Sequence, residues 1–517
     1  MPLRICTIGI LLTGFGLAQV RQAPHDLLVR LQQLAQGGDL TTARNELDAA
    51  LKEFPSEPGL YNLRGIVEAQ QDNPKAAEAD FRKALAEAPG FTGALSNLAR
   101  LYLQQASGNP QAVKNALAAY QQMLRYEPTN EEALYQSAAL LSTTGSFQAS
   151  LNHLNRLPPE VVKRAPSLAI RCADQSGLNQ HALALSSAEQ LLQAKDLEEE
   201  DVLAALPQIS AHAQAIAVRL LEGLVVRQLA SRKGLHQLGL LYLQQQKPSE
   251  ARDTLEKAEQ AGAPSVEMLG SLARAAYDQH DFDGALGYLA HARDLDPKNA
   301  SVHFFFGIVC IEQNLPLEAR KSLEEAVHLD PENAYYNFAL GSVLVQGRDT
   351  TQAVKYFEKY TSLKPNDPRG RFALGVAQFY AADYDAAIAN LSAASASSQS
   401  ASGAHYFLAR IAKAQGKSTT AEKELRRALA ADPKFVDALA ELALVHIRQA
   451  HTTEASQELE KAFAIDPDNF RANANLLILY QKTGDPRAAE QEARFQEIKK
   501  KRAEDEQLLW RTIELRP

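Results

Sequence analysis

Small and bulky apolar residues recur along the chain at a fixed interval, with polar residues between them. From Ala251 to Ala489 an alanine stands at every thirty-fourth position, and a bulky apolar residue follows four places later in every case but the last. Within one segment, Ala319, Leu323 and Val327 are spaced as on one face of a helix. The pattern therefore predicts a series of amphipathic helices, each with one buried stripe.

A second helix is predicted before each alanine, and a proline ends most segments. Leu-Gly pairs precede the alanines, as in Leu340–Gly341, and prolines recur at positions 297, 331, 365, 433 and 467. The missing proline falls at Gln399, in a run of small residues. Since proline disfavours helical geometry in the residue before it, each segment reads as two helices followed by a break.

The order of a bulky residue, Leu-Gly, alanine, a second bulky residue and proline resembles the tetratricopeptide repeat. The first position is often polar here, as in His303, Asn337, Arg371 and His405, where the family has a bulky residue. The resemblance implies an all-α fold, a right-handed α-α superhelical solenoid of about fourteen helix-turn-helix units. Neighbouring units would bury each other's apolar faces, because one hairpin cannot do so alone.

The same spacing continues towards the N-terminus through Ala43, Ala77, Ala116, Ser150, Ala184 and Ala217, with small slips. It predicts an N-terminal repeat block over 24–162, degenerate helical repeats over 163–231 and a regular block over 232–503. Pro207 inside a would-be helix favours a bend in the degenerate part, with a recognition segment as the alternative. Residues 504–517 are expected to form a capping helix, with Leu508, Leu509, Trp510 and Ile513 on its apolar side.

The first eighteen residues have the order of a secretory signal. Arg4 precedes an apolar run from Ile5 to Leu17, and Gly16 and Ala18 are spaced for cleavage after Ala18. The alternative is a buried or membrane-anchoring N-terminal helix. We expect an exported protein, periplasmic or secreted, and no membrane-spanning segment after signal removal, because no other apolar run approaches the length of a membrane span.

Composition excludes several classes of function. With 54 Lys+Arg against 62 Asp+Glu, the net charge of −8 argues against a nucleic-acid partner. Three cysteines cannot make a disulfide framework, and Cys172 and Cys310 fit apolar helix positions. Motifs for a zinc protease or a serine hydrolase are missing, and Gly416–Ser418 lacks the upstream glycine of a phosphate loop. No enzyme activity, metal or cofactor is expected.

By the family resemblance, the first helix of each unit lines a concave groove in which ligands bind. Helical spacing places apolar and aromatic residues there in three consecutive units, and basic residues in the next. The predicted groove residues are Phe304, Ile308, Ile311, Phe338, Val345, Phe372, Val376, Phe379, Tyr406, Arg410 and Lys413. Two interpretations stay open: a working binding groove, or rings buried by tight winding of the repeats.

The sequence therefore favours an exported, non-enzymatic scaffold that binds a protein or peptide in this groove, for assembly in the cell envelope. Aromatic residues would supply affinity, and Arg410 and Lys413 would orient the ligand. The alternative is a structural or self-associating spacer without a specific ligand, with a dry, sealed groove and concentration-dependent oligomers.

Overall fold

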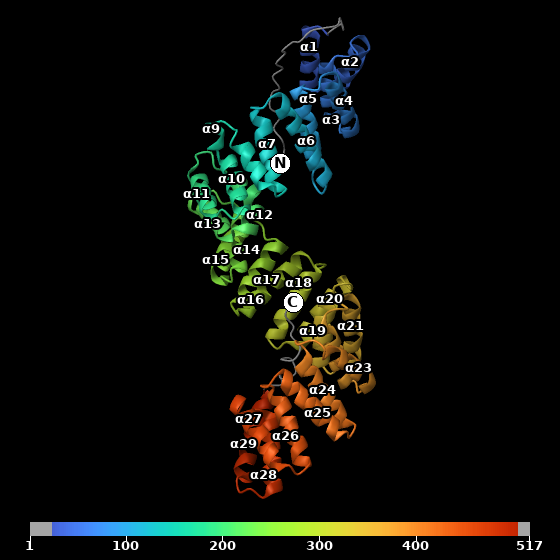
Figure 1. Ribbon diagram of the computed structural model, residues 1–517, viewed down its shortest axis with the longest axis vertical. Helices are drawn as coiled ribbons and strands as arrows, with labels where there is room; N and C mark the ends of the chain where they lie inside the picture. The colour runs from blue at the N-terminus through green and yellow to red at the C-terminus, as the bar shows by residue number, and fades with distance from the viewer. Residues whose placement is uncertain (1–22, 505–517) are drawn as a thin grey trace. The chain divides into compact units, whose positions relative to one another are not determined.

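The computed structural model describes residues 23–504, and this part of the chain is built from α-helices joined by short connections (Figure 1). The expected signal peptide at 1–18 lies outside the described residues, as does the expected capping helix beyond residue 504. The described chain divides between Gly262 and Ala263 into two compact units, called here the first and the second unit. This boundary falls inside the regular block expected over 232–503.

The first unit contains seven helical hairpins and one additional short helix, α9. Its helices are α1 (His25–Gln36), α2 (Leu40–Glu53), α3 (Pro58–Gln70), α4 (Pro74–Glu87), α5 (Thr92–Gln104), α6 (Pro110–Tyr126), α7 (Glu131–Thr143), α8 (Phe147–Leu154), α9 (Pro159–Val162), α10 (Ala165–Gly177), α11 (His181–Gln193), α12 (Glu199–His212), α13 (Gln214–Val226), α14 (Arg232–Gln244) and α15 (Pro248–Gln260).

The second unit contains seven more hairpins in its described residues. Its helices are α16 (Val266–Asp278), α17 (Phe282–Leu295), α18 (Ala300–Glu312), α19 (Pro316–Leu329), α20 (Ala334–Gln346), α21 (Thr350–Leu363), α22 (Pro368–Tyr380), α23 (Tyr384–Ala394), α24 (Ala401–Ala414), α25 (Ser418–Ala431), α26 (Val436–Arg448), α27 (Thr452–Ile465), α28 (Phe470–Thr483) and α29 (Ala488–Glu504). The expected all-α solenoid of about fourteen hairpins is confirmed.

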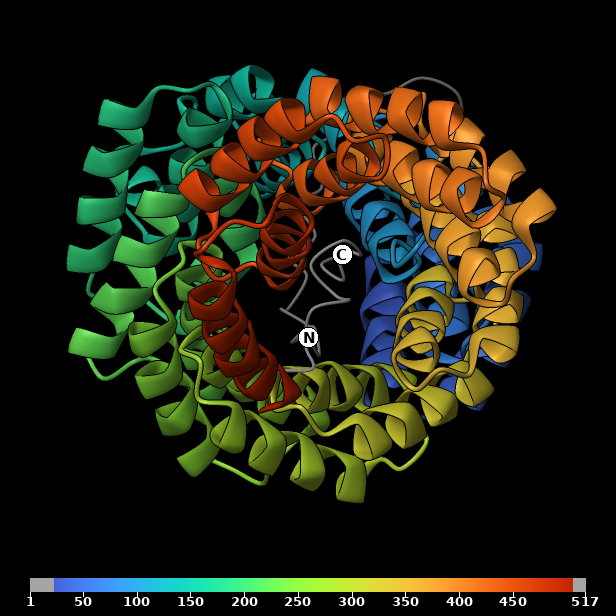
Figure 2. The same cartoon turned by 90° about the horizontal axis from the view of Figure 1, so that it is seen from below.

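Within the second unit, each hairpin is turned relative to the one before it (Figure 2). Consecutive first helices, such as α18 and α20 or α20 and α22, contact one another. Consecutive second helices of this unit, within the described residues, make few such contacts or none. The first helices therefore form the inner side of the curved row, as the family resemblance implied.

Close approach of the two helices in a hairpin explains the alanines and the Leu-Gly pairs. The alanines of the repeat are fully buried from Ala43 to Ala455, for example Ala319 and Ala353. A Cβ added to Gly307 would lie 2.7 Å from Leu323 Cγ, and one added to Gly375 would lie 2.7 Å from Leu391 Cγ. The glycine thus makes room for the bulky residue sixteen positions later on the facing helix.

One alanine of the series does not fit. Ala489 is exposed, and the buried position on α29 is Gln491, whose Nε2 donates a hydrogen bond to Asn473 Oδ1 at 2.9 Å. The turn before α29 runs from Gly484 to Arg487 and is longer than the three-residue turns of the preceding hairpins. This shift moves the buried face of α29 by two residues.

Packing changes in the middle of the first unit, where the sequence pattern weakens. Elsewhere in this unit the second helix of one hairpin packs on the first helix of the next, but here α12 packs closely on α10 and α13 contacts α11. Pro207 lies inside α12, on its exposed side. The degenerate part of the sequence pattern therefore coincides with a change in how the hairpins stack.

Candidate functional site

The predicted groove residues fall into two groups by exposure. Phe338, Phe372 and Tyr406 are buried, with 7%, 6% and 4% of their surface exposed. Val345 and Val376 are buried as well. The other six residues remain half-buried: Phe304, Ile308, Ile311, Phe379, Arg410 and Lys413. Among the predicted groove residues, only the second group keeps a substantial exposed surface.

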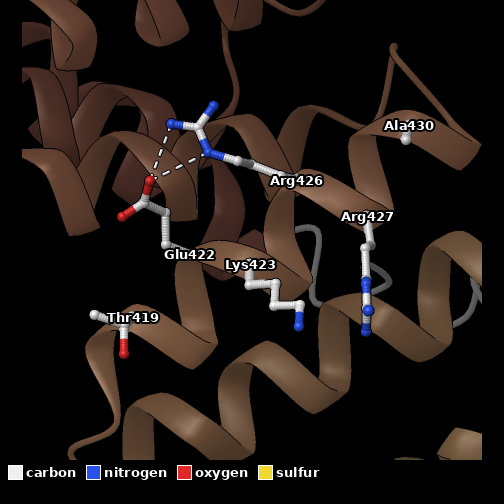
Figure 3. Close-up of a pocket in the computed structure, with 6 residues that line it drawn as sticks. All are labelled: Thr419, Glu422, Lys423, Arg426, Arg427 and Ala430. Carbon is white, nitrogen blue, oxygen red and sulfur yellow. Dashed lines mark hydrogen bonds and ion pairs between the residues drawn. The ribbon is translucent and has the colours of Figure 1, made fainter.

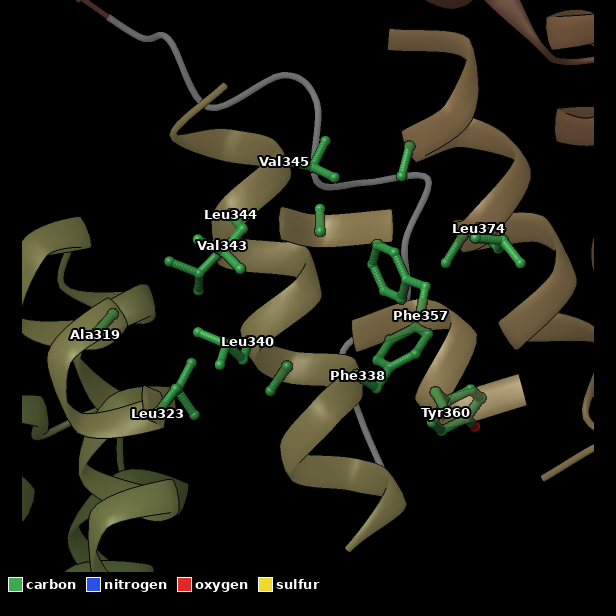
Figure 4. Packing of buried hydrophobic residues seen from close by; sticks show 14 of the residues in the cluster. Ala319, Leu323, Phe338, Leu340, Val343, Leu344, Val345, Phe357, Tyr360 and Leu374 are labelled. Atoms are coloured by element: carbon green, nitrogen blue, oxygen red, sulfur yellow. The ribbon is translucent and has the colours of Figure 1, made fainter. Parts of the chain in front are cut away.

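The buried rings pack between helices instead of lining an open groove. The ring centroid of Phe338 lies 5.5 Å from that of Phe357 and 4.8 Å from that of Tyr360, both on the second helix of the same hairpin (Figure 4). The ring of Phe372 lies 6.2 Å from that of Phe407 on the next first helix. At these positions the structure matches the interpretation in which tight winding buries the rings.

Arg410 is the centre of the strongest local arrangement on the inner side. Its guanidinium carbon lies 4.7 Å from the ring centroid of Phe379 and 5.4 Å from that of Phe407. The rings of Tyr406 and Tyr380 are 5.8 and 5.9 Å away. Nη1 donates one long hydrogen bond, of 3.4 Å, to Tyr380 Oη. Four aromatic rings from α22 and α24 thus hold a half-buried cation by cation–π contacts.

The neighbouring cations, by contrast, are neutralised by carboxylates. Lys413 Nζ lies 2.6 Å from Glu441 Oε2, and Arg471 Nη1 lies 2.8 Å from Glu441 Oε1. Arg471 Nε is also 3.6 Å from Asp437 Oδ1. Among the described residues, no acidic side chain forms an ion pair with Arg410. Of Arg410, Lys413 and Arg471, only Arg410 therefore lacks a carboxylate partner among the described residues.

Sequence reasoning missed the role of the polar residues at the first motif position. His303 Nε2 lies 2.9 Å from the carbonyl oxygen of Pro297, and Asn337 Nδ2 donates to that of Pro331 at 3.0 Å. Asn473 Nδ2 does the same with Pro467 at 3.0 Å. The constant spacing of six residues from proline to the polar side chain was the available signal. These side chains join consecutive repeats and are structural.

A shallow hollow on α25 has a different character. It is lined by Thr419, Glu422, Lys423, Arg426, Arg427 and Ala430 (Figure 3). Arg426 pairs with Glu422 at 3.0 Å, and Arg427 pairs with Glu424 at 2.8 Å. Both arginines are thus paired with carboxylates of their own helix.

Metal-binding clusters and reactive cysteines are missing from residues 23–504. These residues contain no group of three or more histidine, cysteine or acidic side chains placed to hold a metal ion. Burial raises the pKa of the Cys172 thiol to about 12 and that of Cys310 to about 11, so both stay protonated and unreactive at neutral pH. No described helix is both long enough and apolar enough to cross a membrane.

Tandem helical hairpins with an accessible inner side define a helical-repeat solenoid, a class of protein-interaction scaffold. Three family models, each described as tetratricopeptide repeat, match the chain. One matches residues 276–340 and another matches residues 334–367. The remaining model matches four ranges, 30–90, 236–300, 372–434 and 409–470. Because these matches together span more than half of the chain, the protein belongs to the tetratricopeptide repeat family.

Three known proteins show local or distant similarity to this chain. Over 80 residues the chain is 41% identical to Cellulose synthase operon protein C of Xanthomonas axonopodis pv. citri (strain 306), and this covers 14% of the chain and 5% of that protein. The crystal structure of the APC/C hetero-tetramer Cut9-Hcn1 aligns over 87% of this chain and 89% of that chain, with 14% identity and a TM-score of 0.37. A structure from the functional characterization of Pseudomonas aeruginosa pilF aligns over 40% of this chain and 94% of that chain, with 25% identity and a TM-score of 0.35.

Proposed function

We propose that this protein is an exported, non-enzymatic scaffold that binds a protein or peptide on the inner side of its second unit, for assembly in the cell envelope. The observation that carries this proposal is Arg410, a half-buried guanidinium fixed by four rings and without a carboxylate partner in the described chain. A planar cation in that setting can donate paired hydrogen bonds to an acidic group of a partner.

Half-buried apolar residues on neighbouring first helices would complete the site. Phe379 lies directly against Arg410, with ring centroid and guanidinium carbon 4.7 Å apart. Phe304 on α18 stacks at 4.8 Å on Tyr336, and Ile308 and Ile311 follow on the same helix. Binding would remove these surfaces from water, and Arg410 would set the orientation. Lys413 contributes less than the sequence suggests, because Glu441 already neutralises it.

The binding test compares two arginines of the same unit. The chain from Gln19 onward would be crosslinked in its native envelope in three forms: wild type, Arg410→Gln and Arg426→Gln. Arg426 lies on α25, pairs with Glu422, and serves as the matched control. We expect a partner that wild type and Arg426→Gln capture and that Arg410→Gln loses, with circular dichroism unchanged. Equal capture by all three proteins would remove the inner side around Arg410 from consideration.

Export is supported by the order of charge, apolar run and small residues in the first eighteen positions. N-terminal sequencing of protein recovered from the periplasm or medium tests it. A first residue of Gln19 is the expected result. Recovery of protein that begins at Met1 would contradict cleavage.

One observation favours the alternative of a self-associating or purely structural spacer. Phe338, Phe372 and Tyr406 are buried by neighbouring helices, as a sealed groove requires. Sedimentation velocity over a hundredfold range of concentration separates the two functions. Oligomers that grow with concentration, together with no captured partner, would favour the spacer, whereas a constant monomer with a captured partner would favour the scaffold.

A further inference from the structure

A carboxylate is buried without a partner at the junction of two hairpins in the first unit. Asp174 on α10 is fully buried, and neither of its side-chain oxygens has a hydrogen-bond partner among the described residues. The hydroxyls that favour its ionised form belong to Ser142 on α7 and Ser150 on α8. Ser150 Oγ is engaged with the carbonyl of Ala138 at 2.8 Å, so it gives the carboxylate little support.

No charged group on the helices packed against α10 compensates Asp174. These helices are α7, α8, α9, α11 and α12. Their titratable groups, with those of α10, are Glu131, Glu132, Tyr135, His153, Glu160, Arg171, Cys172, His181, Glu189, Glu199, Glu200, Asp201 and His212. None of them shifts the pKa of Asp174, which burial raises to about 7 and which Ser150 and Ser142 lower only in part. An ionised carboxylate in this position would be desolvated and unpaired.

We propose that Asp174 makes this junction pH-sensitive: its carboxylic acid is neutral while the α7–α8 hairpin is packed on α10, and its ionisation loosens that packing. The location suits local opening. The short helix α9 interrupts the repeat beside it, and the hairpin stacking changes from α10 to α13. The inference concerns the first unit and is independent of the function proposed for Arg410.

The direction of the effect follows from proton linkage. In the closed junction Asp174 keeps its proton up to a pH of about 7, because its pKa is raised. In the opened junction Asp174 is solvated and loses its proton above its ordinary pKa of 3.8. Stability of the junction is therefore full below about pH 4, falls as the pH rises towards 7, and is constant above that. The equilibrium constant for opening rises by up to about tenfold per pH unit, and by roughly a thousandfold between pH 4 and pH 7.

Hydrogen exchange of the full chain measures this opening. We would follow peptides from α7, α8 and α10 between pH 5 and 8, and correct each rate for the intrinsic pH dependence of exchange. Wild type should lose protection in these peptides as the pH rises, while peptides from α20 and α21 serve as an internal reference. Asp174→Asn should abolish the dependence. Asp253→Asn, at an exposed position of the same unit, should retain it.

Two results would overturn the proposal: protection that does not change with pH in the wild type, or the same pH dependence in Asp174→Asn. If the asparagine variant does not fold, infrared spectroscopy of the wild type still decides. The carbonyl band of protonated carboxylic acid should be measured at about pH 6.5, where ordinary Asp and Glu are ionised and Asp174 is still largely protonated. It should be weaker in Asp174→Ala than in the wild type, and the difference should disappear by pH 9. Equal bands in the two proteins at about pH 6.5 would mean that Asp174 is ionised in the closed state.

Discussion

At single residues, the distance to the facing helix decides which side chain is tolerated. Gly307 and Gly287 both lie inside helices of the second unit. A Cβ on Gly307 would meet Leu323 Cγ at 2.7 Å and the carbonyl of Ala319 at 3.3 Å, whereas a Cβ on Gly287 would meet nothing within 4 Å. The same substitution should therefore have opposite effects at the two sites.

We expect Gly307→Ala to lower the free energy of unfolding by about 1–3 kcal/mol through overpacking. Gly287→Ala should raise it by about 0.5–1 kcal/mol, because alanine loses less backbone entropy in a helix than glycine. Urea unfolding followed by circular dichroism measures both. Equal shifts for the two variants would show that helix propensity, and not close approach, sets the requirement for glycine.

The turns between the helices of a hairpin make a second demand on single residues. Positive φ angles recur at the same place in eight consecutive turns: Gln246, His280, Asn314, Arg348, Ala382, Gly416, Ala450 and Gly484. Side chains other than glycine are strained in this left-handed region. Ala450, with φ of 63°, and Gly416, with φ of 73°, occupy equivalent positions.

Exchanging these two residue types should change stability in opposite directions. Ala450→Gly relieves the strain and should raise the free energy of unfolding by about 1 kcal/mol or less. Gly416→Ala introduces the strain and should lower it by a similar amount. Thermal unfolding of each single variant checks the sign. A loss of stability in Ala450→Gly would mean that entropy of the unfolded chain outweighs the strain at this turn.

At the scale of the hairpin, ion pairs to a buried carboxylate connect one first helix to the next. Glu441 on α26 has only 6% of its surface exposed and accepts from Lys413 on α24 and from Arg471 on α28. Its two oxygens thus join three consecutive first helices. Because hydrogen bonds to charged groups are stronger than neutral ones, this carboxylate should stabilise the stack measurably.

We expect Glu441→Gln to lower the free energy of unfolding by about 1–3 kcal/mol, because the amide loses the charge and presents donors to one of the two cations. Glu454→Gln, at an exposed position on α27, should change it by less than about 0.5 kcal/mol. Combining Glu441→Gln with Lys413→Met tests the coupling. Purely additive effects would mean that the pair contributes no interaction energy.

The hairpins also show which parts of the structure could be predicted. The thirty-four-residue spacing of alanine and leucine predicts the helix pairs correctly. The spacing is informative because two closely packed helices leave little choice of side chain at their contact, as at Ala319 and Leu323. The burial of Phe338 and Phe372 could not be predicted in the same way. Helical spacing assigns a residue to a face of its helix, but it does not show which other helix covers that face: Phe338 packs on the second helix of its own hairpin, and Phe372 packs on the next first helix. The shift at Ala489 depends on one longer turn, which spacing alone does not reveal.

At the scale of the whole chain, stability should be divided by contacts between neighbours. Within the second unit, consecutive hairpins pack on one another, and the chain separates into two compact units at Gly262. Such solenoids are stabilised by repeat terms and nearest-neighbour interface terms, so a defect should weaken the repeats around it first. Leu323 on α19 is fully buried and faces Gly307 on α18, which makes it a suitable place for a defect.

We expect Leu323→Ala to remove about 2–5 kcal/mol of stability through the lost apolar contacts and the cavity left behind. Hydrogen exchange should show loss of protection first in α18 and α19, next in the hairpins α16–α17 and α20–α21, and none in α1 to α15. Leu317→Ala on the same helix, where 77% of the side chain is exposed, should leave all protection unchanged. A uniform loss across both units would mean that the whole chain unfolds as one cooperative body, and that the boundary at Gly262 does not limit the spread of local unfolding.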